Sequence, residues 1–307
     1  MACKRTGVVM VAVSMVIGLA GPASAYEFRQ TLALGDSGPD VKALQIRVAG
    51  WYPAARQVEM SIDGDFGNGT SAAVRAFQKF YGLAPDGVAG PATFSVLAGI
   101  EDADGSTEHF DWSEFWQKSN SRCSAKANAY SGTFGGGMVA PLRAKKNVKR
   151  LMWRLEAVRA KSGGKSIGIN SGFRSVNYND CIGGARASQH MYGTAVDNRM
   201  AHASNRYERD IARASQFHGI GCYSSLSHNH FDIRLENPKL PASQSWWWPQ
   251  QDGNGRDLAD DGAPCWGESS RSARRHSAGI GDAALLPSER LLTDLSTEAE
   301  WYGGLGD

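Results

Sequence analysis

The sequence lacks an excess of either charge. Its 307 residues contain 33 Lys and Arg against 31 Asp and Glu, which gives a formal net charge of +2. A charge so evenly balanced gives no electrostatic preference for a polyanion, so we expect no nucleic-acid partner. No G-x-S-x-G motif surrounds Ser188, which argues against a serine hydrolase of the nucleophile-elbow type.

Long apolar runs are also scarce. The apolar stretch from Gly7 to Ala20 is shorter than the roughly 20 residues that a transmembrane helix needs. It follows the basic pair Lys4 and Arg5 and is closed by the small-residue sequence Ala23-Ser24-Ala25. This order is typical of a signal peptide. We therefore predict a signal peptide over residues 1–25, secretion, and no membrane segment after cleavage.

Cysteine is infrequent, with five residues in all. Four remain after the predicted signal peptide, and an even number in an exported protein predicts disulfides. No C-x-x-C spacing suggests a structural zinc site. Of the three possible connectivities we favour one, in which each bridge ties a loop or tail to a folded domain: Cys123–Cys181 and Cys222–Cys265.

Residues 26–100 have the pattern of a small three-helix module. We expect Asp40 to cap a first helix and Thr70 to cap a second, while Pro91 suits the first turn of a third. Two Asp-Gly turns separate these helices. The apolar positions spaced for helical faces are Val41, Leu44, Val48, Val74, Phe77 and Phe80.

Several short motifs of this segment resemble the peptidoglycan-binding module of wall hydrolases. They are Gly38-x-x-Val41-x-x-Leu44-Gln45, Asp63-Gly64-x-Phe66-Gly67-x-x-Thr70, Ala76-Phe77-Gln78 and Asp86-Gly87-Val88-x-Gly90-x-x-Thr93. The resemblance implies that peptidoglycan is a partner. Most of these residues are turn or core positions, so the binding belongs to the module as a whole.

The rest of the chain predicts an α+β domain. Residues 101–110 are polar and are interpreted as a linker, and residues 111–250 contain helices and several short strands. Helices are expected over Lys145–Ala160 and Ser204–Phe217, and strands over Ser166–Asn170 and Ser227–Arg234, the latter within a small antiparallel sheet. Residues 251–307 form a polar tail, expected to be largely disordered apart from a terminal helix over Leu285–Trp301.

The motif Ser188-x-His190-x-x-Gly193-x-Ala195-x-Asp197 has the residue types of a metal site. Zinc accepts imidazole nitrogen and carboxylate oxygen, and a hydrolytic site leaves one position for water. A third ligand is needed, and His228-Asn229-His230-Phe231-Asp232 supplies candidates. On a strand, the side chains of His228, His230 and Asp232 would share one face.

Together these motifs resemble the zinc D-Ala-D-Ala carboxypeptidases, a family of secreted wall peptidases. Gly172-Phe173-Arg174-Ser175 and Gly219-Ile220-Gly221 add to the resemblance. It implies one zinc ion bound by His190, Asp197 and His230. It also implies that His228 stabilises the transition state, and that Arg174 stabilises the scissile carbonyl or binds the substrate carboxylate. We expect a monomer that acts on the stem peptides of peptidoglycan.

One position departs from the family pattern. Members of the family have an acidic general base three residues before the last histidine ligand, where this chain has Ser227. A serine hydroxyl is a poor base at neutral pH. His228 or Asp232 could take the role, or an acidic residue from another loop. The alternative functions are a peptidoglycan endopeptidase and a non-catalytic wall-binding protein that contains zinc.

Overall fold

The computed structural model describes residues 26–53, 60–222, 228–233, 246–251 and 257–258. The predicted signal peptide, Ser227, the Cys222–Cys265 bridge and the expected helix Leu285–Trp301 lie wholly or partly outside these residues. Among the described helices, none is long and apolar enough to cross a membrane.

The N-terminal module contains the three predicted helices, which are α1 (Pro39–Val48), α2 (Asn68–Phe80) and α3 (Pro91–Ile100). A single 3-10 turn, η1 (Ala49–Trp51), follows α1. The predicted caps were wrong, because Gly38 and Gly67 precede the first two helices, and Asp40 and Thr70 lie inside them. Pro91 begins α3 as expected. The helices enclose a core that includes Val41, Leu44, Val74, Phe77 and Leu97.

Two glutamines organise the turns of this module in the same way. Gln45 Nε2 donates to Asp63 Oδ1 at 2.9 Å and to Thr70 Oγ1 at 3.0 Å, and its Oε1 accepts from the amide of Gly64. Gln78 makes the matching bonds to Asp86, the amide of Gly87 and Thr93. Each buried amide therefore joins an Asp-Gly turn to the helix that follows it.

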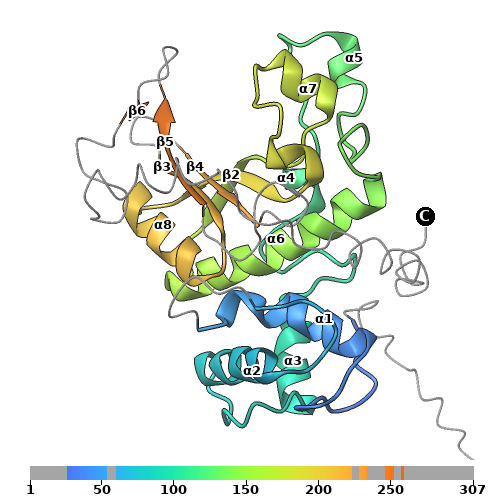
Figure 1. Ribbon diagram of the computed structural model, residues 1–307, viewed down its shortest axis with the longest axis vertical. Helices are drawn as coiled ribbons and strands as arrows, with labels where there is room; N and C mark the ends of the chain where they lie inside the picture. Colours follow the sequence, from blue (N-terminus) through green and yellow to red (C-terminus); the bar gives the residue numbers. More distant parts are fainter. Residues whose placement is uncertain (1–25, 54–59, 223–227, 234–245, 252–256, 259–307) are drawn as a thin grey trace, which may run out of the picture.

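The second unit is a sheet covered on one face by helices. Its elements are α4 (Trp112–Phe115), α5 (Ala125–Asn128), α6 (Pro141–Lys161), β1 (Ile167–Ser171), α7 (Val176–Cys181), η2 (Gln189–Tyr192), β2 (Ala195–Met200), α8 (Asn205–Ala214), β3 (Gly219–Cys222), β4 (Asn229–Asp232), β5 (Trp246–Gln251) and β6 (Asp257–Leu258). Figure 1 shows α6 and α8 on the side of the sheet that faces the module. The predicted α+β class is confirmed.

The sheet has the strand order β1-β2-β4-β3-β5-β6. The first four strands pair antiparallel, as predicted, but β5 pairs parallel with β3, which the sequence did not predict. Val196 on β2 and Phe231 on β4 are opposite each other and pack with Leu151 and Leu155 of α6. Because side chains alternate along a strand, the residues next to them, Asp197 and His230, point to the other face.

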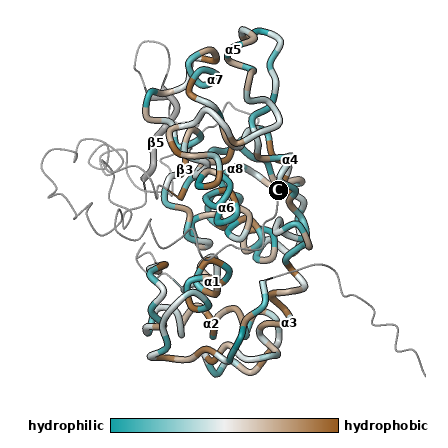
Figure 2. Tube along the Cα trace, turned by 90° about the vertical axis from the view of Figure 1, so that its right-hand side faces the viewer, coloured by the Kyte–Doolittle hydropathy of each residue, from teal (hydrophilic) through white to brown (hydrophobic). Residues whose placement is uncertain are grey.

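Helix α6 belongs to both units. Its Trp153 and Ala157 are buried in the core of the N-terminal module, and its opposite side packs under the sheet (Figures 1 and 2). A Cβ atom at Gly50 would lie 2.5 Å from the Cβ of Ala157, so only glycine allows η1 to approach α6 this closely. Lys161 Nζ donates to the carbonyl of Gly50 at 2.7 Å. The two units therefore share a packed interface.

A buried ion cluster reinforces this interface. Glu101, at the end of α3, accepts from Arg47 Nε of α1 at 2.9 Å and from Lys149 Nζ of α6 at 2.5 Å. Burial alone would raise the pKa of Glu101, but the two cations outweigh it and lower that pKa. The segment 101–110 that joins the units is itself folded, with bridges from Thr107 to Glu101 and to Phe110.

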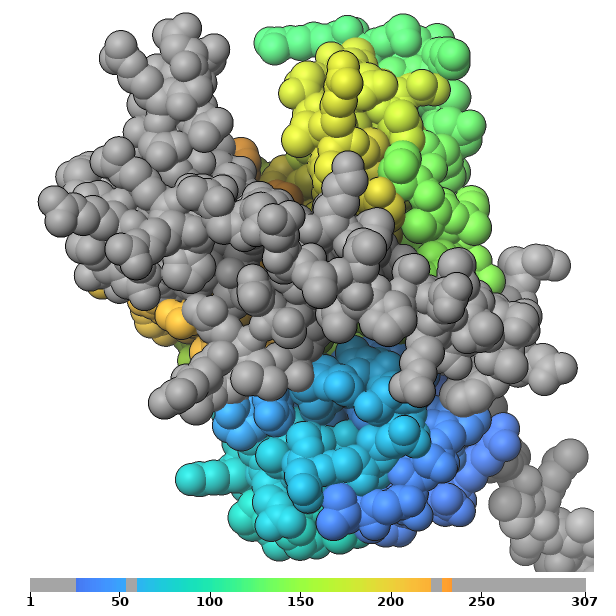
Figure 3. Space-filling model, viewed as in Figure 1, coloured from blue at the N-terminus to red at the C-terminus, as the bar shows by residue number. Residues whose placement is uncertain are grey.

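One predicted disulfide is present, between Cys123 and Cys181. It ties the segment before α5 to the end of α7, and these parts form a continuous lobe at the top of the molecule in Figure 3. Ser175, the cap of α7, donates its amide to Gln117 Oε1 at 2.6 Å. The lobe therefore fixes the backbone next to Arg174.

Candidate metal centre

His190 lies on η2 and is almost fully buried. Its Nδ1 is 2.6 Å from the carbonyl oxygen of Gly172. Because a carbonyl can only accept, Nδ1 carries the proton and Nε2 presents a lone pair on the other side of the ring. Burial, followed by the charge of Arg174, lowers the pKa of His190 to about 4. This histidine is therefore neutral at physiological pH.

His230 lies on β4 and is held in a similar way. Its Nε2 is 3.2 Å from Asp232 Oδ2, which accepts the proton and leaves the Nδ1 lone pair facing His190. Asp232 is fully buried against Gly219, where a Cβ atom would lie 2.0 Å from Oδ2 of the carboxylate. Burial lowers the pKa of His230, but Asp197 and Asp232 outweigh it and raise that pKa.

Asp197 lies on β2 directly opposite His230. Its Oδ1 is 2.9 Å from His230 Nδ1 and 3.2 Å from His190 Nε2. Its Oδ2 accepts a hydrogen bond from Arg174 Nη2. Burial would raise the pKa of Asp197, but its contacts with His190 and His230 hold that pKa well below its usual range. The carboxylate is therefore ionised.

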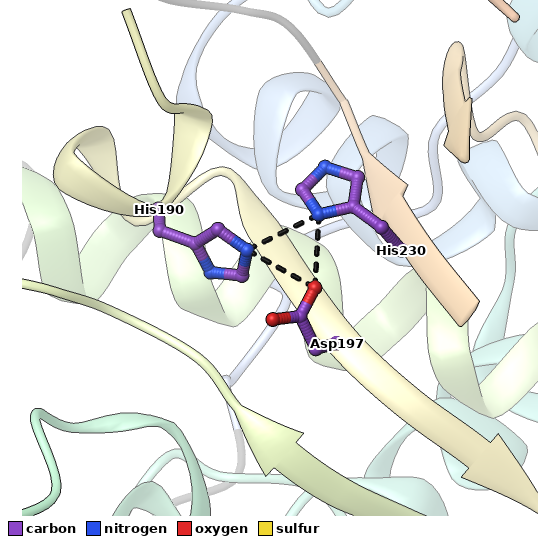
Figure 4. A group of neighbouring side chains, drawn as sticks. All are labelled: His190, Asp197 and His230. Carbon is purple, nitrogen blue, oxygen red and sulfur yellow. Dashed lines mark hydrogen bonds and ion pairs between the residues drawn. The ribbon is translucent and has the colours of Figure 1, made fainter. Parts of the chain in front are cut away.

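Three acceptor atoms thus meet at one point (Figure 4). His190 Nε2 and His230 Nδ1 are 3.1 Å apart, and both are within 3.2 Å of Asp197 Oδ1. Zinc bonds of about 2.0–2.2 Å in a tetrahedral site place the ligand atoms about 3.3 Å apart. These three residues form a group that can hold a metal ion, which is called the metal-ligand group below. The donor set and spacing fit zinc, with one position left for water.

The guanidinium of Arg174 contacts one member of the metal-ligand group directly. Its Nη2 donates to Asp197, and its Nε donates to Ser171 Oγ at 2.9 Å. Its amide donates to the carbonyl of His190 at 3.0 Å. Arg174 therefore connects two of the three metal-ligand candidates.

The remaining candidates lie around β4. His228 directly precedes the strand and is partly exposed, while Asp232 is buried behind His230. Ser227 lies outside the described residues. The sequence interpretation missed Ser171 and Gln117, which hold Arg174 and its neighbour Ser175. Neither stands in a motif, and only the folded chain brings them to the site.

Two family models match the chain. One described as Peptidase M15 covers residues 123–232, which include all three members of the metal-ligand group. One described as a putative peptidoglycan binding domain covers residues 37–97. The predicted resemblances are thereby confirmed.

Two curated proteins illustrate the similarity. The zinc D-Ala-D-Ala carboxypeptidase of Streptomyces albus G is 41% identical over 195 residues, which cover 64% of this chain and 70% of that protein. The N-acetylmuramoyl-L-alanine amidase CwlL of Bacillus licheniformis is 44% identical over 70 residues, 22% of this chain and 19% of that protein. With the metal-ligand group inside the matched domain and a relative aligned over most of both chains, this chain belongs to the peptidase M15 family.

Proposed function

We propose that this protein is a secreted zinc peptidase that hydrolyses stem peptides of peptidoglycan and removes the terminal D-Ala of D-Ala-D-Ala. The observation that carries the proposal is the convergence of His190 Nε2, Asp197 Oδ1 and His230 Nδ1 inside the peptidase M15 match. The similarity to the zinc D-Ala-D-Ala carboxypeptidase supports the choice of metal and of reaction.

In this proposal His190, Asp197 and His230 hold one zinc ion. Bound zinc supplies a Lewis acid that lowers the pKa of water and polarises the scissile carbonyl. The chain contributes ligands whose tautomers are set in advance by Gly172 and Asp232. Because the two lone pairs and the carboxylate already face one another, little reorganisation is needed when the ion binds.

Arg174 is assigned two roles, one toward Asp197 and one toward the substrate. Its Nη2 engages Oδ2 of Asp197, so Asp197 offers a single oxygen to the metal. Arginine carries five donors, and only those on Nε and Nη2 have hydrogen bonds with described residues. The hydrogens on Nη1 suit a substrate carbonyl or the free carboxylate of a terminal D-Ala.

The proton transfer is assigned to His228. It stands two residues before His230, and its side chain is partly exposed, so it can reach both water and substrate. Asp232, by contrast, is fully buried and bonded to His230, which supports a positioning role instead of that of a base. An acidic residue from another loop remains the alternative for the base.

The N-terminal module gives the expected location. The peptidoglycan-binding match supports a protein that binds the cell wall, and the sequence predicts a signal peptide over residues 1–25 that exports it. We propose that it acts at the wall as a monomer, with residues 26–100 binding and residues 111–250 cleaving.

The test uses the mature protein, loaded with zinc, on synthetic stem pentapeptide and on purified wall. Release of free D-Ala from pentapeptide, abolished in His190→Ala, would support the proposal. Cut cross-links without release of D-Ala would replace it with an endopeptidase. Equal inactivity of both proteins, with wall binding retained, would indicate that zinc has only a structural role.

A further inference from the structure

The face of the sheet opposite the metal centre carries a second set of polar side chains. Asn198 follows Asp197 on β2, and Asn229 precedes His230 on β4. The two asparagines are directly opposite each other in the strand register. Because side chains alternate along a strand, they point to the helical layer, away from the metal-ligand group.

Glu208, in the first turn of α8, meets this pair. Asn229 Nδ2 donates to Glu208 Oε2 at 2.7 Å. All three side chains are buried, with exposed fractions of 0% for Asn198, 0% for Asn229 and 1% for Glu208. Among the described residues, Asn198 Oδ1 and Nδ2 and Asn229 Oδ1 have no hydrogen-bond partner.

This arrangement is unfavourable for stability alone. A buried amide loses its hydration, and the unpaired side-chain atoms of Asn198 and Asn229 leave that loss uncompensated. Burial raises the pKa of Glu208 to about 7, because the hydrogen bonds and the arginine charges around the carboxylate offset the lost hydration only in part. Neighbouring positions on the same face are occupied by Val196 and Phe231. Apolar residues would pack beside them at lower cost, so packing does not account for the polar set.

Asn198 and Asn229 are themselves paired residues of the β2–β4 ladder, so their contacts bear directly on its register. Asp197 and His230 meet because they are opposite each other, and Asn198 and Asn229 are the next pair of the same short ladder. A slip of one residue would turn a ligand to the wrong face of the sheet. A side-chain bond from β4 to α8 is specific to one register, whereas apolar contacts tolerate several.

We propose that Glu208, with Asn229 and Asn198, is a positioning residue for the metal centre. It anchors β4 to α8 in the register that brings His230 Nδ1 to Asp197 Oδ1. This inference rests on the proposed roles of Asp197 and His230 as metal ligands. It assigns a function to residues on the far side of the sheet, which touch neither metal nor substrate.

The test compares Glu208→Leu with Glu208→Gln in the full mature chain at pH 7.5. Zinc affinity is measured by competition with a chromophoric chelator, and site geometry by the visible absorption of the cobalt-substituted protein. Glu208→Leu removes the acceptor and should weaken zinc binding about 10- to 100-fold and alter the cobalt spectrum. Glu208→Gln keeps an acceptor oxygen and should retain most of the affinity and the wild-type spectrum.

Glu156→Gln is the matched control. Glu156 is also a buried carboxylate on a helix, but it bonds to His109 away from the sheet. It should lower stability while leaving zinc affinity and the cobalt spectrum unchanged. A wild-type affinity and spectrum in folded Glu208→Leu would overturn the inference. If Glu208→Leu does not fold, Asn229→Ser breaks the same bond, and the same two outcomes decide.

The two proposals fail in distinguishable ways. If the wild-type chain binds neither zinc nor cobalt, the proposed metal centre fails, and the positioning role fails with it. If the wild type binds both metals and the variants do so equally well, only the positioning role is lost.

Discussion

Arg174 donates a hydrogen bond to the carboxylate oxygen of Asp197 that faces away from His190 and His230. The guanidinium thereby fixes which oxygen is offered to the metal. Its second bond, to Ser171 Oγ, fixes the guanidinium in turn. A point charge at this position could not make both bonds with the same geometry.

We therefore expect Arg174→Lys to weaken zinc binding by about tenfold and Arg174→Ala by more, in the range typical of residues that orient metal ligands. Chelator competition measures the affinity, and steady-state kinetics measure KM and kcat. An increase in KM beyond the loss of metal would indicate that Nη1 also binds substrate. Unchanged zinc affinity in Arg174→Ala would exclude the positioning role.

Asp232 provides a second test of ligand orientation. Asp232→Asn can still accept from His230 Nε2 through its amide oxygen, but it loses the negative charge that favours a bound cation. We expect zinc affinity to fall about tenfold with the fold intact, as measured by chelator competition and circular dichroism. If zinc affinity stays at the wild-type level while kcat collapses, Asp232 acts on the reaction itself, and our assignment is wrong.

The ion cluster between the two units predicts a large effect on stability. Glu101→Gln would leave Arg47 and Lys149 as buried charges without their carboxylate, which costs about 3–5 kcal/mol in the free energy of unfolding. Urea unfolding of the variant and of wild type gives the difference. Glu108→Gln is the control, because the Glu108 side chain is 54% exposed and should be near neutral on substitution. A loss below about 1 kcal/mol for Glu101→Gln would contradict the packed interface.

Glu208 predicts a pH dependence of stability. Its pKa is about 7 in the folded state, above the ordinary value of 4.5, so the folded state binds the proton more tightly than the unfolded state. The resulting stabilisation is fully present below pH 4.5 and is lost as the pH rises through 7. The difference between these two pKa values corresponds to about 3 kcal/mol in the free energy of unfolding. Unfolding curves from pH 4.5 to 8 should show this decline in wild type, relative to Glu208→Gln, and parallel curves would refute it.

Local patterns predicted the elements well. The amphipathic helix expected over Lys145–Ala160 is α6, the strand expected over Ser166–Asn170 is β1, and Ser204 caps α8 as expected, with its hydroxyl accepting from the amide of Tyr207. These features depend on neighbours in sequence. The cap predictions for α1 and α2 were wrong, because glycines precede both helices. A residue type that favours caps can also lie inside the first turn, and the sequence alone does not separate the two positions.

The metal-ligand group was predictable because the chemistry of zinc restricts its donors to a few residue types. His190, Asp197 and His230 could be chosen from the motifs alone, and the structure brings them together. The bonds around them could not be predicted in the same way. Gly172 and Ser171 reach the site through tertiary packing, and Glu208 meets only the far side of the sheet that carries it. Their residue types do not distinguish these roles from those of ordinary turn, strand and helix positions.

Trp153 and Ala157 belong to the peptidase M15 match in sequence and to the core of the binding module in space. The packed interface therefore fixes the distance between the binding module and the metal centre. A flexible linker would have allowed that distance to vary. If the chain acts as proposed, a module bound to peptidoglycan would present stem peptides to the metal centre at one offset and one orientation. Spacing along the wall, as well as peptide chemistry, would then select the bonds that are cut.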